Sequence, residues 1–356
     1  MPAQRLWRHT IRIMVAVLLM ATAAVGQRPA VRPPNGPPPP VDLHRHSVSL
    51  DQIVFDTFTG SSVPLSQATA STIDRLRDAI RPIYQPRYDD ANGGDSLRPT
   101  DLVIGYVGKT TAYAYPVNML NFHEIVNDVI DGTPLMITYC PLCASGAVYD
   151  RRLDGQELVF GNTSALFEND MVMFDHQTGS YWMQVAGKAI VGTLTGQWLT
   201  LLPSTTMPWR QWRALYPQTR ILARDQGFGR PYPYTRNPFR GYRRRVDAHQ
   251  FPFPVSTEKI DPRLPASALV LTVRVGSDEK AYPLEVLGDA VVHDTIDGQP
   301  VVIFSSTQGP SGGAFLPQLA GPLQGQRLTA LPSRRAFWFS LSLSIPNLML
   351  YQPGSH

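Results

Sequence analysis

The chain has 356 residues, of which 43% are hydrophobic and 17% are charged, so it is long enough for two ordinary domains and its composition excludes a disordered protein. The formal charge is +4, but Arg5, Arg8 and Arg12 lie in a segment that we expect to be removed, which would leave the mature chain near +1. A nearly neutral chain has no strong field for attracting phosphates, so nucleic acid is not an expected partner.

The first predicted element is a secretory signal peptide over residues 1–26. Its three arginines precede an apolar run from Ile13 to Val25, and Ala24 and Gly26 supply the small residues that a signal peptidase reads. The run is short for a membrane span, which favours a cleaved signal and a periplasmic or secreted protein. An uncleaved segment that associates the protein with the membrane remains the alternative.

The next segment, residues 27–48, is predicted to be a proline-rich linker. Residues 27–40 read QRPAVRPPNGPPPP. Such proline density favours an extended polyproline conformation that cannot pack a core.

An internal repeat organises the rest of the chain. The tripeptide Ala-Tyr-Pro at 114–116 recurs at 281–283, and Ile-Asp-Gly at 130–132 recurs at 296–298. Residues 192–204 then match 321–333 at a smaller offset, so the second copy lacks a stretch that corresponds roughly to 150–191. We therefore expect two diverged copies of one β-rich unit, the second truncated internally. The expected bounds are 49–223 for the first copy, 224–262 for a basic and aromatic connection, and 263–352 for the second copy.

Hydrophobic patterning predicts mostly strands in the first copy. It indicates a hairpin over 102–107 and 113–115, a short helix over 118–128, and a compact strand over 135–139. Further strands are expected at 148–151, 157–160, 171–175 and 180–184, followed by a short helix at 208–216 that begins with proline. The predicted fold class is α+β, mostly β.

The two cysteines of the chain form a Cys-x-x-Cys motif at the end of a predicted strand. Cys140 and Cys143 could close only a four-residue loop, so a disulfide-stapled fold is excluded. The pair could instead oxidise reversibly, or bind one soft or borderline cation as thiolates with further ligands from elsewhere. Both interpretations stay open.

The repeat adds a third residue to this candidate site. Cys140 aligns with Ser306, Cys143 with Gly309 and His123 with Asp289, so the second copy has lost all three groups while the scaffold residues around them stay. We therefore predict that His123, Cys140 and Cys143 form one site. Neutral drift at exposed turns would also explain the loss.

The stretch missing from the second copy offers additional ligands. Methionine and histidine beside thiolates would suit copper, whereas two cysteines with two histidines would suit zinc. Core filling by the methionines and a surface position for the histidine are the plainer interpretations. The candidate residues are Met171, Met173, Asp175 and His176.

A second cluster, residues 224–245, interleaves arginines with Tyr232, Tyr234, Phe239 and Tyr242. It could bind an anion or line a cleft beside the site, or it could simply be a solvated connection between the copies. No glycine-rich phosphate loop, dinucleotide fingerprint or hydrolase motif is present in the sequence, so no nucleotide cofactor is expected.

Several of these motifs resemble the family known as domain of unknown function 3179. The resemblance lies in HEIVND at 123–128, TYCPLC at 138–143, Ser145-Gly146 and YDR at 149–151, and it extends through FD at 174–175 and QTGS at 177–180. It covers roughly residues 50–351 and implies an exported or membrane-associated bacterial or archaeal protein without an established activity. The second copy departs from the pattern, because it lacks the Asp…Thr-Gly-Ser…Trp block.

Three functions follow as hypotheses. The first is an extracytoplasmic protein that binds copper or zinc through Cys140, Cys143 and His123. The second is a thiol-disulfide oxidoreductase that uses the same two cysteines, with His123 lowering the pKa of a thiol. The third is a non-catalytic binding or scaffolding module in which the cysteines are incidental, so the sequence leaves open whether the protein is an enzyme. The sequence names no macromolecular partner.

Overall fold

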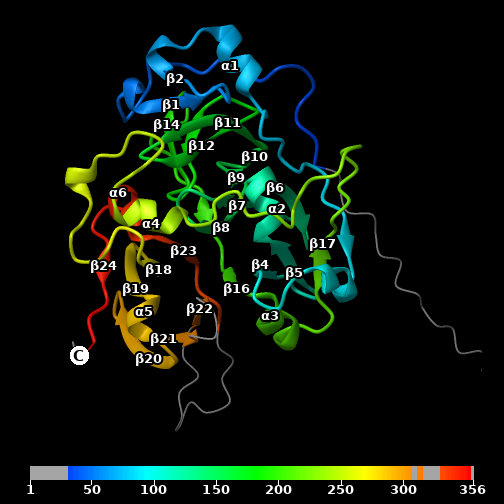
Figure 1. The fold of residues 1–356 in the computed structure, drawn as a ribbon, viewed down its shortest axis with the longest axis vertical. Coiled ribbons are helices and arrows are strands. Elements are labelled where there is room, and N and C mark those ends of the chain that lie inside the picture. The colour runs from blue at the N-terminus through cyan, green and yellow to red at the C-terminus, as the bar shows by residue number, and fades with distance from the viewer. Residues whose placement is uncertain (1–30, 307–310, 316–328, 354–356) are drawn as a thin grey trace, which may run out of the picture.

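The structure is a computed structural model that describes residues 31–306, 311–315 and 329–353. Within these residues the chain is mostly β, as predicted, and its strands form three large sheets and one short hairpin (Figure 1). The predicted signal peptide and residues 27–30 of the predicted linker lie outside the described residues. None of the helices that the structure describes is long and apolar enough to cross a membrane.

Sheet A has six antiparallel strands and lies at the top of Figure 1. Four of its strands come from residues 160–191, and two come from residues 53–64. In order across the sheet, the strands are β14 (Lys188–Val191), β13 (Tyr181–Met183), β12 (Asp170–Asp175), β11 (Phe160–Phe167), β1 (Ile53–Asp56) and β2 (Ser62–Pro64).

Sheet B combines strands from the N-terminal and C-terminal halves of the chain. Strand β23, from the C-terminal half, pairs with β8 from the N-terminal half and joins the two sets. The order is β24 (Met349–Leu350), β19 (Asp278–Pro283), β18 (Leu269–Val275), β23 (Ser333–Phe337), β8 (Ser145–Asp150), β7 (Thr133–Cys140) and β6 (Ile125–Ile130), with β15 (Thr200–Leu201) also paired to β8.

Sheet C is composite in the same way, because β22 from the C-terminal half pairs with β16 from the N-terminal half. The order is β20 (Ala290–Ile296), β21 (Gln299–Ser306), β22 (Ser311–Phe315), β16 (Thr205–Pro208), β4 (Leu102–Val107), β5 (Ala112–Pro116), β17 (Arg220–Leu222) and β3 (Tyr88–Asp89). Each half of the chain therefore completes a sheet begun by the other.

The helices of the described residues are short. They are α1 (Ala70–Leu76), α2 (Val117–His123), α3 (Trp209–Leu215), α4 (Tyr242–Asp247), α5 (Leu284–Leu287) and α6 (Trp338–Ser344). Of these, α2, α3, α5 and α6 each begin directly after a strand. Short 3₁₀ turns occupy Leu50–Gln52, Leu65–Gln67, Ala91–Ser96 and Thr257–Lys259, and β9 (Arg152–Leu153) and β10 (Gln156–Glu157) form the separate hairpin.

Most predicted elements are present, but the predicted helix over 118–128 is wrong in its second half. The helix α2 ends at His123, because Glu124 takes a left-handed conformation with φ of 56°. The β-branched residues Ile125 and Val126 then enter β6, which pairs with β7 along its whole length. The predicted strand at 157–160 is also interrupted, since β10 ends at Glu157 and β11 begins at Phe160.

The core that holds the cysteines lies between sheets A and B. Cys140 and Cys143 share one buried apolar cluster with Met136 of β7 and with Met171 and Trp182 of sheet A. This cluster shields the two cysteines from solvent. Because part of it comes from sheet A, the position of sheet A determines which side chains the thiols contact.

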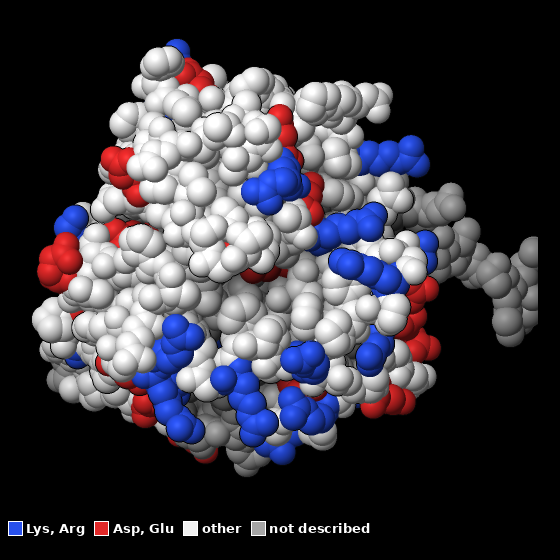
Figure 2. Space-filling view, turned by 45° about the horizontal axis from the view of Figure 1, so that its top comes forward, with Lys and Arg blue, Asp and Glu red and all other residues white. Residues whose placement is uncertain are grey.

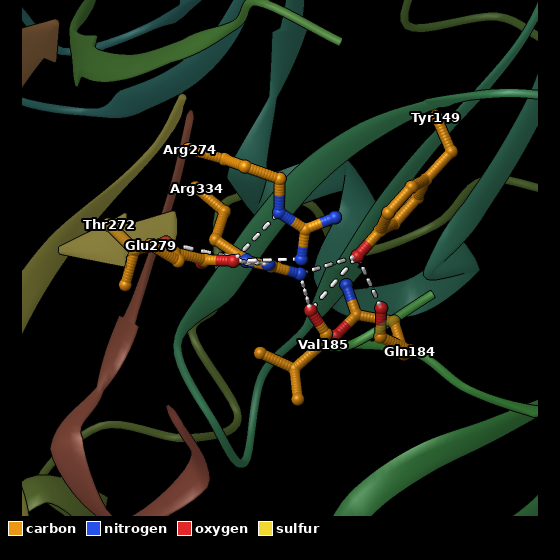
Figure 3. A network of polar contacts seen from close by, with 7 residues as sticks. All are labelled: Tyr149, Gln184, Val185, Thr272, Arg274, Glu279 and Arg334. Carbon is orange, nitrogen blue, oxygen red and sulfur yellow. Dashed lines mark hydrogen bonds and ion pairs between the residues drawn. The ribbon is translucent and has the colours of Figure 1, made fainter. Parts of the chain in front are cut away.

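A buried polar network that includes Tyr149 of this core connects the two halves of the chain (Figure 3). Nη2 of Arg334 lies 2.7 Å from both carboxylate oxygens of Glu279, and Nη1 donates to the hydroxyl of Tyr149 at 3.2 Å and to the carbonyl of Val185. Burial would raise the pKa of Glu279, but the guanidinium groups of Arg334 and Arg274 outweigh it and lower that pKa to about 2. The ion pair therefore stays charged at neutral pH and connects β19, β23 and β8.

Candidate metal site

The Cys-x-x-Cys motif forms the loop between β7 and β8. Cys140, the last residue of β7, pairs with Ser145, the first residue of β8, and residues 141–144 close the hairpin. Ala144 takes a positive φ of 48°, and the backbone N–H of Cys143 donates to the carbonyl of Cys140 at 3.3 Å. Both cysteines are free, and their exposed fractions are 1% and 0%. The motif thus lies at a strand end, but it is buried.

A second hairpin brings a carboxylate to the thiols. Glu168 and Asn169 connect β11 to β12 with positive φ at both positions, which is the geometry of a tight two-residue turn. The thiol of Cys143 donates to the carbonyl of Asn169 at 3.4 Å. Asp170, the first residue of β12, places a carboxylate oxygen so that it and the two Sγ atoms all lie within 4.8 Å of one another. Cys140, Cys143 and Asp170 therefore form a candidate metal-binding group.

One carboxylate oxygen of Asp170 accepts no hydrogen bond from the described residues. Oδ2 accepts from the backbone N–H of Val185 at 2.9 Å, whereas Oδ1 is buried and has no hydrogen-bond partner among the residues that the structure describes. A buried carboxylate oxygen without a donor or a cation is costly. This oxygen is therefore available to a ligand.

Burial controls the charge of the three groups. It raises the pKa of Cys140 and, together with the neighbouring Cys140, raises that of Cys143 well above its usual value. Burial also raises the pKa of Asp170 to about 7, although the Val185 N–H and the thiols act in the opposite direction. Fully deprotonated, the three groups would carry three negative charges in a core that disfavours any charge, so only a bound cation would stabilise that state.

Glu124 is a second buried acid beside this group. The Nδ2 of Asn162 donates to Oε2 of Glu124 at 2.6 Å and lies 3.2 Å from the sulfur of Met171. Burial raises the pKa of Glu124 to about 8; the hydrogen bond from Asn162 opposes this shift, and the charge of Asp170 adds to it. Glu124 is therefore a protonated acid at neutral pH. Its left-handed backbone is the kind of strain that functional sites often hold.

The structure places His123 in a different environment from the thiols. Its Nδ1 donates to the carbonyl of Arg81 at 2.8 Å, so the neutral ring accepts from the hydroxyl of Tyr234 through Nε2 at 2.7 Å. The rings of Phe228 and Tyr232 pack against it with centroids 4.8 and 4.6 Å away. Burial lowers the pKa of His123 to about 4. Both ring nitrogens are engaged, and the group that joins the thiols contains Asp170 and not His123.

The other candidate ligands divide between the site and its surroundings. Met171 lies in the same cluster as the thiols and contacts Asn162. Met173 is buried in that cluster too, but its sulfur lies 4.0 Å from the hydroxyl of Thr138. Asp175 accepts from the indole N–H of Trp182 at 2.9 Å, and Nε2 of His176 lies 2.9 Å from the hydroxyl of Tyr84. Those last contacts satisfy Asp175 and His176 away from the thiols.

Two cavities flank the cysteine loop. One, of about 440 Å³, is lined by Glu124, Asn162 and Met171 and by Leu142 of the loop. The other, of about 550 Å³, is lined by Tyr139, Pro141 and Ala144 on its loop side. Residues 239–242 line both cavities. The buried site therefore has a hollow on either side.

Sequence reasoning missed Asp170 and Glu124. Asp170 adjoins the candidate Met171, and Glu124 adjoins the candidate His123, so both lie within the motifs already singled out. The single usable signal was the presence of ionisable residues next to strand ends and turns. Their convergence on the thiols depends on how two separate hairpins pack, which no spacing in the sequence reveals.

The fold and the site together define a mostly β protein with a buried Cys-Cys-Asp group. Residues 77–347 match the family described as protein of unknown function (DUF3179), and the chain belongs to this family. A search among curated proteins and a search among solved structures each found no match.

Proposed function

We propose that the protein binds one transition-metal ion through Cys140, Cys143 and Asp170. The observation that carries this proposal is the buried group of Cys140, Cys143 and Asp170, in which the two sulfurs and a carboxylate oxygen lie within 4.8 Å of one another. In addition, Oδ1 of Asp170 is buried and lacks a hydrogen-bond partner in the described part of the chain. Two thiolates and one carboxylate are ligands that proteins use for zinc, while the sulfur of Met171 nearby would suit copper. The carboxylate favours zinc of the two.

Three protein ligands would leave one position of a tetrahedral zinc site open. Catalytic zinc sites have this composition, whereas structural sites use four protein ligands. A cavity of about 440 Å³ lies beside the site and is lined by Glu124, Met171 and Leu142 of the cysteine loop, although the three ligand residues themselves do not line it. Metal binding would require both thiols to lose their protons, so the affinity would rise with pH.

The oxidoreductase hypothesis has weaker support. Reactive cysteines are partly exposed and have lowered pKa values, because the thiolate is the nucleophile. Cys140 and Cys143 are buried, and burial raises the pKa of both. These properties favour a ligand role over a redox role.

Metal content tests the proposal directly. The purified protein and its Cys140→Ser, Cys143→Ser and Asp170→Asn variants would be analysed for zinc and copper, and the metal-free forms would be titrated with Co²⁺ while the thiolate-to-cobalt absorption is recorded. We expect one metal ion per chain and a thiolate band in the parent protein, and the loss of both in the cysteine variants. Equal metal content in the parent and in Cys140→Ser would overturn the proposal.

We also infer that the chain contains two diverged copies of one unit. The helices Trp209–Leu215 and Trp338–Ser344 follow matched strands, and β17 pairs in parallel with β5 as β24 does with β19. The hydroxyl of Tyr115 donates to Asp128 at 2.8 Å, and Tyr282 donates to Asp294 at the same distance. An experimental structure in which these two sets of strands differ in connectivity would refute the duplication.

Export is a further proposal, supported by the basic and apolar pattern of residues 5–25. Sequencing the N-terminus of protein recovered outside the cytoplasm would test it. We expect a mature chain that begins just after Gly26; recovery of the protein only from the cytoplasm would contradict it.

A further inference from the structure

The larger of the two cavities is strongly cationic. This cleft of about 550 Å³ runs along the cysteine loop, and Asp101 is the one carboxylate among its described lining residues. Figure 2 shows Lys and Arg side chains gathered on one face of the molecule, with few Asp and Glu among them. The arginines that line the cleft are Arg98, Arg224, Arg236, Arg240 and Arg243.

Three of these arginines form no ion pair with a carboxylate of the described residues. Arg98 pairs with Asp101 at 2.8 Å, and Arg243 pairs with Glu285 at the rim. The guanidinium of Arg224 lies over the ring of Tyr234, 5.9 Å from its centroid. In the described residues, the side chains of Arg236 and Arg240 form no ion pair or side-chain hydrogen bond. Their charges are free to meet an anion.

The cleft also holds an unsatisfied buried polar atom. Oδ1 of Asn118, on the first turn of α2, is buried and has no hydrogen-bond partner among the residues that the structure describes. Since a carbonyl oxygen accepts, it would suit a ligand that carries a hydroxyl or N–H group beside its anionic group. The volume fits a small molecule and not a macromolecule.

Tyr242 connects the cleft to the cysteine loop. It lines the cleft, and its hydroxyl accepts from Nδ2 of Asn169 at 2.9 Å. The carbonyl of Asn169 in turn accepts from the thiol of Cys143. A molecule in the cleft would therefore contact a residue that is held to the candidate metal site, and it would touch Pro141 and Ala144 of the loop itself.

We propose that this cleft is a binding site for a small organic anion, a phosphate ester or a carboxylate, held by Arg236 and Arg240. Guanidinium groups match both anions, because their planar N–H donors can meet two oxygens at once. The proposal does not depend on metal binding, since none of the residues that it uses is a candidate ligand.

Calorimetric titration of the full chain with inorganic phosphate and, separately, with citrate tests this site. We expect at least one of them to bind, and Arg236→Gln and Arg240→Gln each to weaken that binding by about tenfold, the loss expected for a charge-assisted hydrogen bond. Arg244→Gln is the matched control, because Arg244 lies on α4 beside Arg243 but is absent from the lining of the cleft. Binding of phosphate alone identifies a phosphate ester, and binding of citrate alone identifies a carboxylate.

Failure of both probes to bind at millimolar concentration, or an equal loss in Arg244→Gln, would overturn the proposal. Circular dichroism of each variant excludes unfolding as the cause of a loss. The Cys140→Ser variant separates this site from the metal site, since we expect it to lose metal and keep the anion affinity of the parent protein.

Discussion

Asp170 and Cys143 meet from two different hairpins, with a carboxylate oxygen of Asp170 within 4.8 Å of the sulfur of Cys143. Cys143 belongs to the loop between β7 and β8, and Asp170 follows the turn between β11 and β12. The contact therefore exists only because sheet A packs on sheet B. It supplies the third group of the proposed metal site.

Asp170→Asn is expected to lower metal affinity by more than the roughly 10–100-fold that loss of an outer-shell group costs, because the amide cannot supply a charged ligand. Competition with a chelator of known affinity would measure the change. Asp175→Asn is the matched control, a buried carboxylate on the same strand that bonds to Trp182 instead. Similar losses in both variants would contradict a ligand role for Asp170.

His123→Gln is expected to keep the metal and to change the acid sensitivity of the protein. The pKa of His123 is about 4 in the folded state and near 6.5 in an unfolded chain, so the unfolded chain binds the proton first as pH falls. The contribution of His123 to the free energy of unfolding is therefore fully present above pH 6.5. As the pH falls from 6.5 to 4, this contribution decreases by up to about 1.4 kcal/mol per pH unit.

The variant should show a shallower loss over that pH range in urea unfolding experiments. Metal analysis of the same preparation provides the second readout. Loss of metal by a folded His123→Gln variant would show that His123 is a metal ligand. An unchanged pH dependence of unfolding would contradict a buried neutral ring.

Glu279→Gln and Glu124→Gln are expected to differ sharply in their effect on stability. Glu279 is charged in a buried pair with Arg334, and removing one partner of such a pair costs about 3–5 kcal/mol. Glu124 has a pKa of about 8, so at pH 7 it is already neutral, and glutamine keeps an acceptor for Asn162. We expect its substitution to cost at most about 1 kcal/mol.

Urea unfolding at pH 7 would compare the two variants, each serving as the control for the other. The lowered pKa of Glu279 also predicts that its contribution is present above pH 4.5 and is lost as pH falls towards 2. Equal destabilisation by the two substitutions would show that Glu124 is charged in the folded protein.

The protein is expected to unfold in a single transition. Strand β23 completes sheet B beside β8, and β22 continues sheet C beside β16, so neither half retains whole sheets without the other. Calorimetry should give one peak whose van't Hoff and calorimetric enthalpies agree. Two separate peaks would mean that the halves are independent domains.

Much of the local structure could be predicted because it depends on neighbours in the chain. The apolar run at 135–139 lies within β7, and the proline at 208 precedes the helix Trp209–Leu215 as expected. The helix predicted over 118–128 was wrong after His123 because the pairing of β6 with β7 outweighed the helical spacing of the apolar residues.

The candidate site could be predicted only in part. Only two residues separate Cys140 from Cys143, so their spacing alone brings both to one strand end. The third group could not be assigned from spacing. His123 precedes the cysteines and Asp170 follows them, and no local sequence pattern indicates which of the two side chains lies beside the sulfurs. The positive φ of Glu124 turns the chain just after His123, whose ring bonds to Arg81 and Tyr234.

The sequence by itself determined the family, the mostly β character and the presence of a Cys-x-x-Cys loop after a strand, since each rests on residues close together in the chain. Only the tertiary structure decided that the loop is buried, that Asp170 joins it and that Arg224, Arg236, Arg240 and Arg243 line a cleft beside it. Those relationships depend on the packing of one sheet against another. The free energy of that packing comes from burying apolar surface contributed by distant parts of the chain, so the spacing of residues within one motif does not predict it.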